Sequence, residues 1–165
     1  MMPERQDHSF LEKLRVELDR ARNLESEEFQ NANARIKWIA YTNSAQAELV
    51  VKQIFRRIRE IRGASEQELI AKLPYYYVMD NILKNLKEKY HKYIEAIVLP
   101  SFDLELKAAA GFNDTFNKYM GLFLSWEKFI SASKLVGCLN KLYEAFRSRV
   151  EVGNFRTSTK SSNLH

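Results

Sequence analysis

The chain has little of what turn-rich, disulfide-bonded or metal-binding proteins need. Its 165 residues include five glycines, three prolines, three histidines and one cysteine. The scarcity of glycine and proline argues against a β sandwich or barrel, whose many short strands are joined by turns. A single cysteine, Cys138, excludes an internal disulfide bond. It also favours a reducing compartment, the cytosol or the nucleus.

Signatures of catalysis and of cofactor binding are missing as well. None of the three histidines has a Cys, His or carboxylate partner at metal-ligand spacing. The sequence contains no glycine-rich phosphate loop and suggests no Ser/His/Asp or Cys/His arrangement. Cys138 lies beside an apolar stripe, so we expect it to act as a small buried hydrophobic residue and not as a nucleophile. We therefore expect a protein that is not an enzyme, with no catalytic residues, no metal and no cofactor.

Long apolar runs are also absent. No stretch approaches the roughly 18 to 20 apolar residues that span a bilayer, and no signal-peptide pattern opens the chain. The net charge is +5. This mild excess favours acidic partners such as phosphopeptides, nucleic acid or anionic lipid, without choosing among them.

What the sequence does have is helical periodicity. Hydrophobic residues make up 45% of the chain, and they recur at i, i+3 and i+4 with no long alternating run. The pattern predicts an all-α domain over residues 9–150, with seven or eight short helices packed antiparallel or in a right-handed coil. The polar residues 151–165 are predicted to be a disordered tail. The expected helices cover residues 9–21, 35–41, 44–62, 75–87, 89–99, 102–110 and 114–126, and one begins at Ser133.

Local signals suggest where some helices begin and end. Ser9 with Glu12, and Ser65 with Glu68, match capping boxes at helix starts. Gly63 is expected to end the helix before it. Pro74 fits the first turn of a helix better than an interior, so the central helix is expected from Tyr75. The polar and acidic residues 23–34 are expected to form a loop or a weak helical turn.

The central helix carries a row of hydrogen-bonding groups. Tyr77, Asp80, Lys84 and Asn85 share one face at i, i+3, i+7 and i+8, beside an apolar stripe that includes Met79. A phenol, a carboxylate, an ammonium group and an amide in a row beside a buried stripe would suit the wall of a peptide groove.

This segment resembles the RNA polymerase II C-terminal-domain interaction domain, or CID. The family helix reads roughly Leu-Tyr-Leu-Leu-Asp-Ser-Ile-Val-Lys-Asn, and here residues 76–85 read Tyr-Tyr-Val-Met-Asp-Asn-Ile-Leu-Lys-Asn. The likeness extends over about residues 9–147. It includes residues 36–61, which are similar to the family's second and third helices, and Trp126-Glu127-Lys128, which is similar to its Trp-Glu-Glu-Arg element.

The resemblance implies a right-handed superhelix and a role for each matching residue. Asp80 would accept a hydrogen bond from a peptide tyrosine, and Tyr77 would line the slot for that ring. Asn85, assisted by Asn81, would bond the peptide backbone, and Lys84 would add positive potential. Each has an ordinary alternative: Tyr77 could be a packing residue, and Asp80 could form a surface ion pair with Lys84.

The phosphate-binding half of the family pattern is altered. Relatives that recognise phosphoserine carry arginines five residues before the tryptophan and three after it, where this chain has Gly121 and Phe129. Lys118 and Lys128 are candidates for phosphate contacts as point charges, but they lack the bidentate geometry of arginine. We expect weakened or altered dependence on phosphoserine.

The expected function is a nuclear module that binds the tail of RNA polymerase II's largest subunit, phosphorylated or not. It would link transcription to RNA 3′-end processing or termination. The alternative is a VHS/ENTH-like trafficking adaptor that binds sorting peptides, or phosphoinositides through the basic residues 56–62. A membrane role is disfavoured because no amphipathic segment with exposed aromatics precedes Ser9. RNA binding through the same arginines has no motif to support it. A helical scaffold without a ligand is the remaining option.

Overall fold

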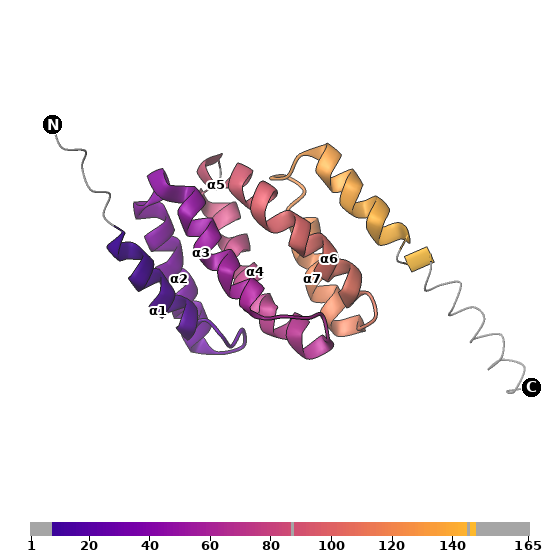
Figure 1. The fold of residues 1–165 in the computed structure, drawn as a ribbon, viewed down its shortest axis with the longest axis horizontal. Helices are drawn as coiled ribbons and strands as arrows, with labels where there is room; N and C mark the ends of the chain where they lie inside the picture. Colours follow the sequence, from indigo (N-terminus) through magenta and orange to yellow (C-terminus); the bar gives the residue numbers. More distant parts are fainter. Residues whose placement is uncertain (1–7, 87, 145, 148–165) are drawn as a thin grey trace, which may run out of the picture.

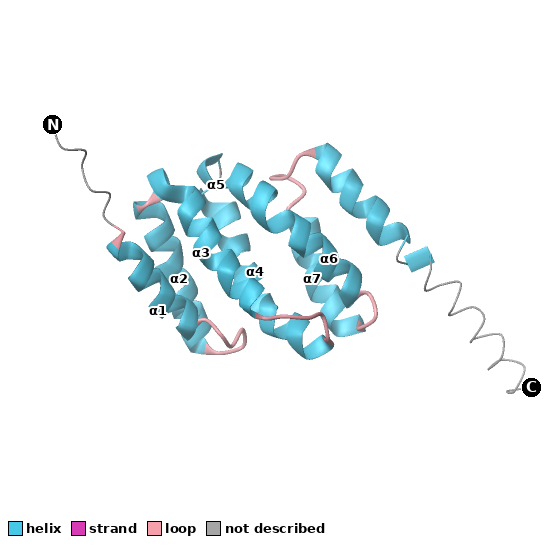
Figure 2. Cartoon of the chain, in the orientation of Figure 1, coloured by secondary structure: helices cyan, strands magenta, loops and turns pink. Residues whose placement is uncertain are grey.

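The structure, a computed structural model, describes residues 8–86, 88–144 and 146–147. Within these residues every regular element is a helix, which confirms the all-α class (Figure 2). The expected tail, residues 151–165, lies outside the described residues. The elements are α1 (Ser9–Arg20), α2 (Glu27–Thr42), a 3-10 turn (Ser44–Gln46), α3 (Ala47–Glu60), α4 (Glu66–Leu86), α5 (Glu88–Tyr93), a π turn (Ile94–Val98), α6 (Leu99–Ala109) and α7 (Asn113–Ser125). Residues 132–144 are also helical.

The helices lie side by side, roughly in chain order (Figure 1). The α1–α2 pair forms one end of the array, α3 and α4 the middle, and α6, α7 and helix 132–144 the other end. α4 packs against α2, α3, α5, α6 and α7, so it is the central helix of the fold. The right-handed superhelix implied by the family resemblance stays a prediction.

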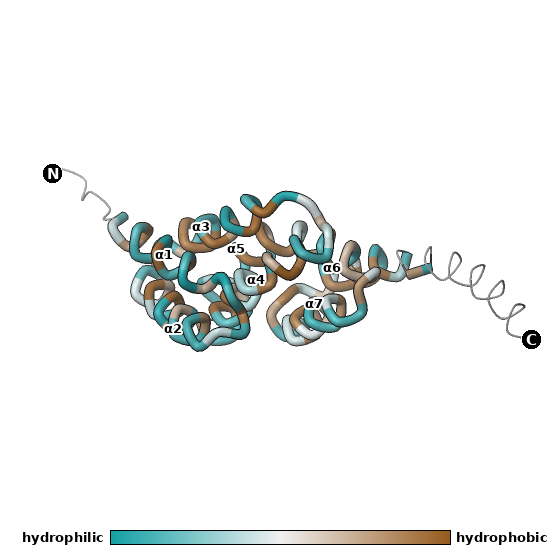
Figure 3. Tube along the Cα trace, turned by 90° about the horizontal axis from the view of Figure 1, so that it is seen from below, coloured by the Kyte–Doolittle hydropathy of each residue, from teal (hydrophilic) through white to brown (hydrophobic). Residues whose placement is uncertain are grey.

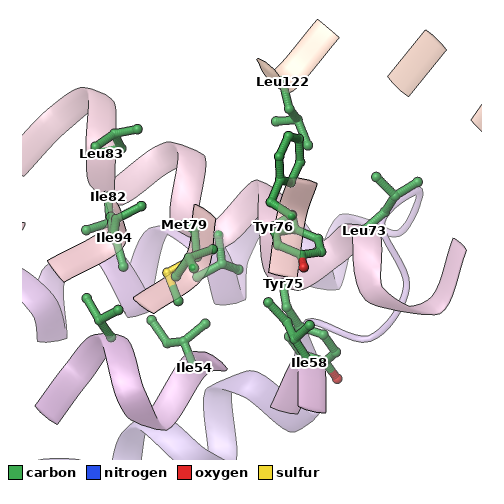
Figure 4. Close-up of a cluster of buried hydrophobic side chains, with 14 of the residues drawn as sticks. Ile54, Ile58, Leu73, Tyr75, Tyr76, Met79, Ile82, Leu83, Ile94 and Leu122 are labelled. Atoms are coloured by element: carbon green, nitrogen blue, oxygen red, sulfur yellow. The ribbon is translucent and has the colours of Figure 1, made fainter. Parts of the chain in front are cut away.

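α4 is central because its apolar face is broad. Met79 and Tyr76 are fully buried among Ile54 and Ile58 of α3 and Leu122 of α7 (Figure 4). Burying a large aliphatic or aromatic side chain contributes about 1.5–3 kcal/mol, so this cluster holds α3 and α7 on α4. The polar groups predicted for the neighbouring face therefore stand on a rigid element.

The loop or weak helical turn predicted at residues 23–34 is wrong, because most of this segment belongs to the long helix α2. The Ser26 hydroxyl caps the helix by accepting a hydrogen bond from the Phe29 amide at 3.0 Å. Glu27 and Glu28 lie in the first turn, where carboxylates interact favourably with the helix dipole. Phe29 is buried, which anchors this turn in the core. The acidic composition marks the start of a helix here.

The start predicted for the central helix is also wrong. The Ser65–Glu68 capping box forms, with the Glu68 amide 3.3 Å from Ser65 Oγ, but it opens the same helix that continues to Leu86. Pro74 lies inside α4. Proline removes one intrahelical hydrogen bond there, and the burial of Leu73 and Tyr75 on either side offsets that cost.

Four smaller boundaries differ from expectation. α1 begins at Ser9 itself, and the Glu12 carboxylate bonds to Arg15. α7 begins at Asn113, one residue before its expected start at 114. Pro100 lies in the first turn of α6, where it is tolerated, so the helical path continues from α5 through the π turn. α3 ends at Glu60, two residues before its expected end at 62, and Gly63, with a φ of 100°, lies in the turn that follows.

Candidate functional site

The polar edge of α4 lies between α2 and α7. Figure 3 shows α2 and α7 on the same side of the molecule with α4 between them. Hydrogen bonds join the edge to both neighbours. Asn81 Nδ2 donates to Asn33 Oδ1 of α2 at 3.1 Å, and Trp126 Nε1, just after α7, donates to Asp80 Oδ1 at 2.8 Å.

The two oxygens of the Asp80 carboxylate have different surroundings. Oδ1 accepts from Trp126 Nε1, from Ser125 Oγ at 3.3 Å and from Lys84 Nζ at 3.0 Å. Oδ2 is bonded by Lys84 alone among the described residues, at 3.1 Å. The Asp80 side chain is 13% exposed. The inner oxygen thus ties α4 to the end of α7, and the outer oxygen keeps capacity for a further donor.

The alternative role of Asp80 is therefore present in the structure. Its i,i+4 ion pair with Lys84 forms, and Lys84 remains 41% exposed. A fully exposed i,i+4 pair contributes about 0.3–0.5 kcal/mol, and this pair contributes more because the Asp80 carboxylate is mostly buried. A further donor at Oδ2 would therefore compete with Lys84.

Tyr77 stands one turn before Asp80 on the same helix and is half-buried. Burial raises the pKa of its phenol, and the negative charge of Asp80 raises that pKa further. Tyr77 therefore stays neutral at physiological pH, with an apolar ring surface and a hydroxyl donor.

Asn81 and Asn85 continue the edge as linked amides. Asn85 Nδ2 donates to the Asn81 backbone oxygen and to Asn81 Oδ1, both at 2.8 Å. Asn85 is exposed and also lines a hollow of about 400 Å³ with Tyr41, Leu86 and Lys89. The five predicted site residues thus lie along one edge of α4, where Lys84 bonds Asp80 and Asn85 bonds Asn81, and the edge runs from Tyr77 to this hollow.

The predicted phosphate contacts are less well placed. Lys118 and Lys128 are exposed, and neither has an ion pair within the part of the chain described. Lys118 lies seven residues before Ser125, which is about 10 Å along the axis of α7. Gly121 is exposed, with open space where a Cβ would stand. Phe129 packs edge-on against His91, with ring centroids 5.3 Å apart, and its side chain packs against the hydrophobic core.

Sequence reasoning missed three partners of this edge. Asn33 belongs to the segment predicted as a loop or a weak helical turn, and no sequence pattern singles out Ser125. Trp126 enters the family resemblance without any predicted contact to Asp80, yet it is fully buried and donates its indole N–H to that carboxylate. The signal was available, because a buried indole N–H needs an acceptor.

Other features of the described residues do not converge on this edge. A mostly apolar hollow of about 610 Å³ lies between α1 and α2, beside the exposed Trp38. No group of three or more His, Cys, Asp or Glu among them could hold a metal ion. None of the described helices has the length and apolar character needed to cross a membrane.

Comparisons of the chain with protein-family models, with curated proteins and with solved structures found no match. The resemblance to the CID family therefore rests on the residues quoted above.

Proposed function

We propose that the polar edge of α4 binds a tyrosine-containing peptide. The peptide would come from the C-terminal tail of RNA polymerase II's largest subunit, and the module would act in the nucleus, where it would couple transcription to RNA 3′-end processing or termination. The observation that carries the proposal is the Asp80 carboxylate, fixed through Oδ1 by Trp126 and bonded at Oδ2 by an exposed lysine. The family resemblance supplies the identity of the peptide.

The edge offers a complementary group for each part of such a ligand. A peptide tyrosine would donate its hydroxyl to Asp80 Oδ2 and lay its ring against Tyr77. Lys84 would turn from Oδ2 to the phenol oxygen. The free carbonyl oxygen of Asn85 would accept from a peptide amide. A hydrogen bond to a charged acceptor contributes about 1.5–3 kcal/mol, of which part offsets the ordering of a disordered tail.

Asp80→Asn is expected to weaken peptide binding about tenfold to a hundredfold, without unfolding the protein. The Asn carbonyl oxygen can take the place of Oδ1 and still accept from Trp126, whereas its NH2 group replaces the acceptor Oδ2. Losing one charge-assisted hydrogen bond accounts for this range. Fluorescence anisotropy with labelled tail peptides measures the affinity, and thermal unfolding checks the fold.

The matched control is a peptide with its tyrosine replaced by phenylalanine. Wild type should bind it as weakly as Asp80→Asn binds the tyrosine peptide, and the two changes together should add little more. Independent, additive losses would show that the hydroxyl does not reach Asp80. Failure of wild type to bind any tail peptide would reject the proposed function.

Gly121→Arg is expected to strengthen binding of a serine-phosphorylated tail peptide about tenfold relative to the unphosphorylated one. The position is exposed and open, and arginine forms bidentate bonds to phosphate. Replacing a helical glycine should also raise stability by about 0.5–1 kcal/mol. The same anisotropy titration measures the ratio. Gly121→Gln is the uncharged control, and an equal ratio for both variants would contradict the expectation.

A further inference from the structure

A row of cations follows the seam between α3 and α5. We call it the basic stripe, and it consists of Lys52, Arg56, Arg59, Arg62, Lys89 and Lys92. Lys89 Nζ bonds Ser44 Oγ at 3.3 Å, which sets the start of α5 beside the turn that leads into α3. Ile97 lies farther along, beside Phe55 and Arg59. The chain from α5 into the π turn therefore runs along α3 in the same direction.

Two hollows open along this stripe. One, of about 310 Å³, is lined by Lys89, Lys92 and Tyr93 together with the start of α3. The other, of about 570 Å³, is lined by four cations and by Phe55, Glu60 and Ile97; its cations are Lys52, Arg56, Arg59 and Arg62. Each hollow therefore places a half-buried aromatic ring next to positive charge, and Lys92 Nζ lies 4.8 Å from the centroid of the Tyr93 ring.

The charge of the stripe is only partly neutralised. Lys52 pairs with Glu48 at 3.0 Å, and Arg56 pairs loosely with Glu60 at 3.7 Å. Glu88 is the other carboxylate that lines these hollows. Arg59 and Arg62 are exposed and form no ion pair with any described residue. Two guanidinium groups at one end of the stripe thus remain available to an anion.

The neighbouring Arg57 shows what a structural arginine looks like in this helix. It bonds Asp19 Oδ1 at 2.6 Å and the Arg15 carbonyl at 3.3 Å, and its side chain is 18% exposed. It faces α1 and belongs to the packing of the fold. Arg59 and Arg62 make no comparable contact, so packing does not account for them.

We propose that the basic stripe binds single-stranded nucleic acid, with RNA as the polymer that a transcription-coupled module would meet. Cations in a row suit a linear polyanion better than a single phosphate group. Lys52 to Arg59 alone spans about 10 Å at 1.5 Å per helical residue, and Arg62 extends the row beyond the end of α3. Aromatic rings among the cations are the usual means of binding unpaired bases without sequence preference.

An anionic membrane is the competing ligand for such a stripe, and the apolar surface disfavours it. Peripheral helices insert exposed apolar side chains beside their cations. The large hydrophobic side chains that are exposed among the described residues all lie outside α3 and α5: Trp38, Tyr41, Ile70, Leu104, Leu124, Val136, Leu139 and Tyr143. A lipid surface would find the half-buried rings of Phe55 and Tyr93 among the cations and, at the Lys89 end, the exposed Tyr41 alone, which is little apolar surface to insert.

α3, which with Arg62 just after it carries most of the stripe, lies on a different side of the molecule from the α4 edge. Lys89, at the α5 end of the stripe, lines the same hollow as Asn85 of the edge. α3 is on the side opposite α2 and α7 in Figure 3, with α4 between. Nucleic acid on α3 would leave the α4 edge free, so the two ligands could be held at once. The choice of RNA as the polymer rests on the proposed function, whereas binding of single-stranded nucleic acid by the stripe can be tested alone.

The test compares Arg59→Gln/Arg62→Gln with Lys13→Gln/Lys107→Gln, a control that removes the same charge from exposed positions outside the stripe. Anisotropy of a labelled oligouridine is measured at several salt concentrations. Each lost phosphate contact lowers the slope of log affinity against log salt by about 0.7, so the stripe variant should lose about 1.4. At about 0.1 M salt this corresponds to a roughly tenfold to thirtyfold loss of affinity. The control should stay within about twofold of wild type.

Four outcomes would overturn the inference. Wild type could fail to bind oligouridine at low salt, or the stripe variant could lose no more affinity than the control. Equal affinity for a duplex of the same length would remove the single-strand preference. Capture by phosphatidylserine vesicles that needs Arg59 and Arg62, without oligouridine binding, would make the stripe a membrane surface. Tail-peptide affinity measured on the same variants keeps this result separate from the α4 edge.

Discussion

Lys72→Met is expected to lower the free energy of unfolding by about 3–5 kcal/mol at neutral pH. Lys72 Nζ lies 2.6 Å from Glu105 Oε1 and donates to the Gly63 carbonyl at 2.6 Å. The side chains of Lys72 and Glu105 are only 7% and 10% exposed. Methionine replaces the aliphatic stem but leaves a buried carboxylate without its cation, which carries a penalty of this size. Urea denaturation measures the loss.

The loss should depend on pH, with a sign set by Glu105. Burial raises the pKa of the Glu105 carboxyl above its ordinary value of 4.5. The hydrogen bond and positive charge of Lys72 oppose that rise in pKa without cancelling it. A carboxyl whose folded pKa is raised is most favourable at low pH, and its contribution is lost as pH rises through that folded pKa. Without Lys72 the pKa rises further. The deficit of Lys72→Met should therefore shrink as pH falls from about 7 to about 5, and an unchanged deficit would contradict the explanation.

Lys72→Met/Glu105→Gln separates the charge from the packing. The glutamine carbonyl can still accept the hydrogen bond that the buried Tyr76 hydroxyl donates to Glu105. Replacing both partners of a buried pair is much less costly than removing one. The double variant should recover at least half of the lost stability and lose the added pH dependence. If it were as unstable as the single variant, the cavity around Lys72 would be the cause.

Much of the fold could be predicted because buried stripes repeat at helical spacing. The errors arose where a local preference competes with tertiary burial. Residues 23–34 are polar enough for a loop, yet Phe29 and Ala32 are buried and hold the turn in α2. Pro74 disfavours a helix interior, yet α4 passes through it because the residues on both sides are buried. Such competition depends on neighbours that the sequence does not place.

In the candidate site, too, the sequence predicts what lies on one helix and misses what tertiary packing brings to it. Tyr77, Asp80, Asn81, Lys84 and Asn85 could be placed together because they share one helix, where spacing alone sets the geometry. Their partners Asn33, Ser125 and Trp126 lie more than forty residues away and meet them only through packing of α2 and α7 on α4. The sequence therefore predicts the row, and the three-dimensional packing shows that one oxygen of Asp80 is held inside.

Trp126→Ala is expected to lower stability by about 3–5 kcal/mol, and Trp126→Phe by about 1–3 kcal/mol. Trp126 is fully buried, and its ring centroid lies 4.6 Å from that of Phe102. Alanine leaves a large cavity in the core. Phenylalanine fills much of that space but leaves Asp80 Oδ1 without the indole N–H, whose bond is 2.8 Å long. Chemical denaturation of both variants measures the two losses.

Trp126→Phe and Asp80→Asn together separate the two oxygens of Asp80. Trp126→Phe removes the donor to the inner oxygen, so it should reduce stability and leave the affinity of the folded protein for a tyrosine peptide within about threefold. Asp80→Asn keeps an acceptor for the indole and removes the outer oxygen, so it should do the reverse. If both variants lost stability and neither changed affinity, the role of Asp80 would be limited to joining α4 to the end of α7. The opposed losses are expected because the inner oxygen faces Trp126 and the outer one only an exposed lysine.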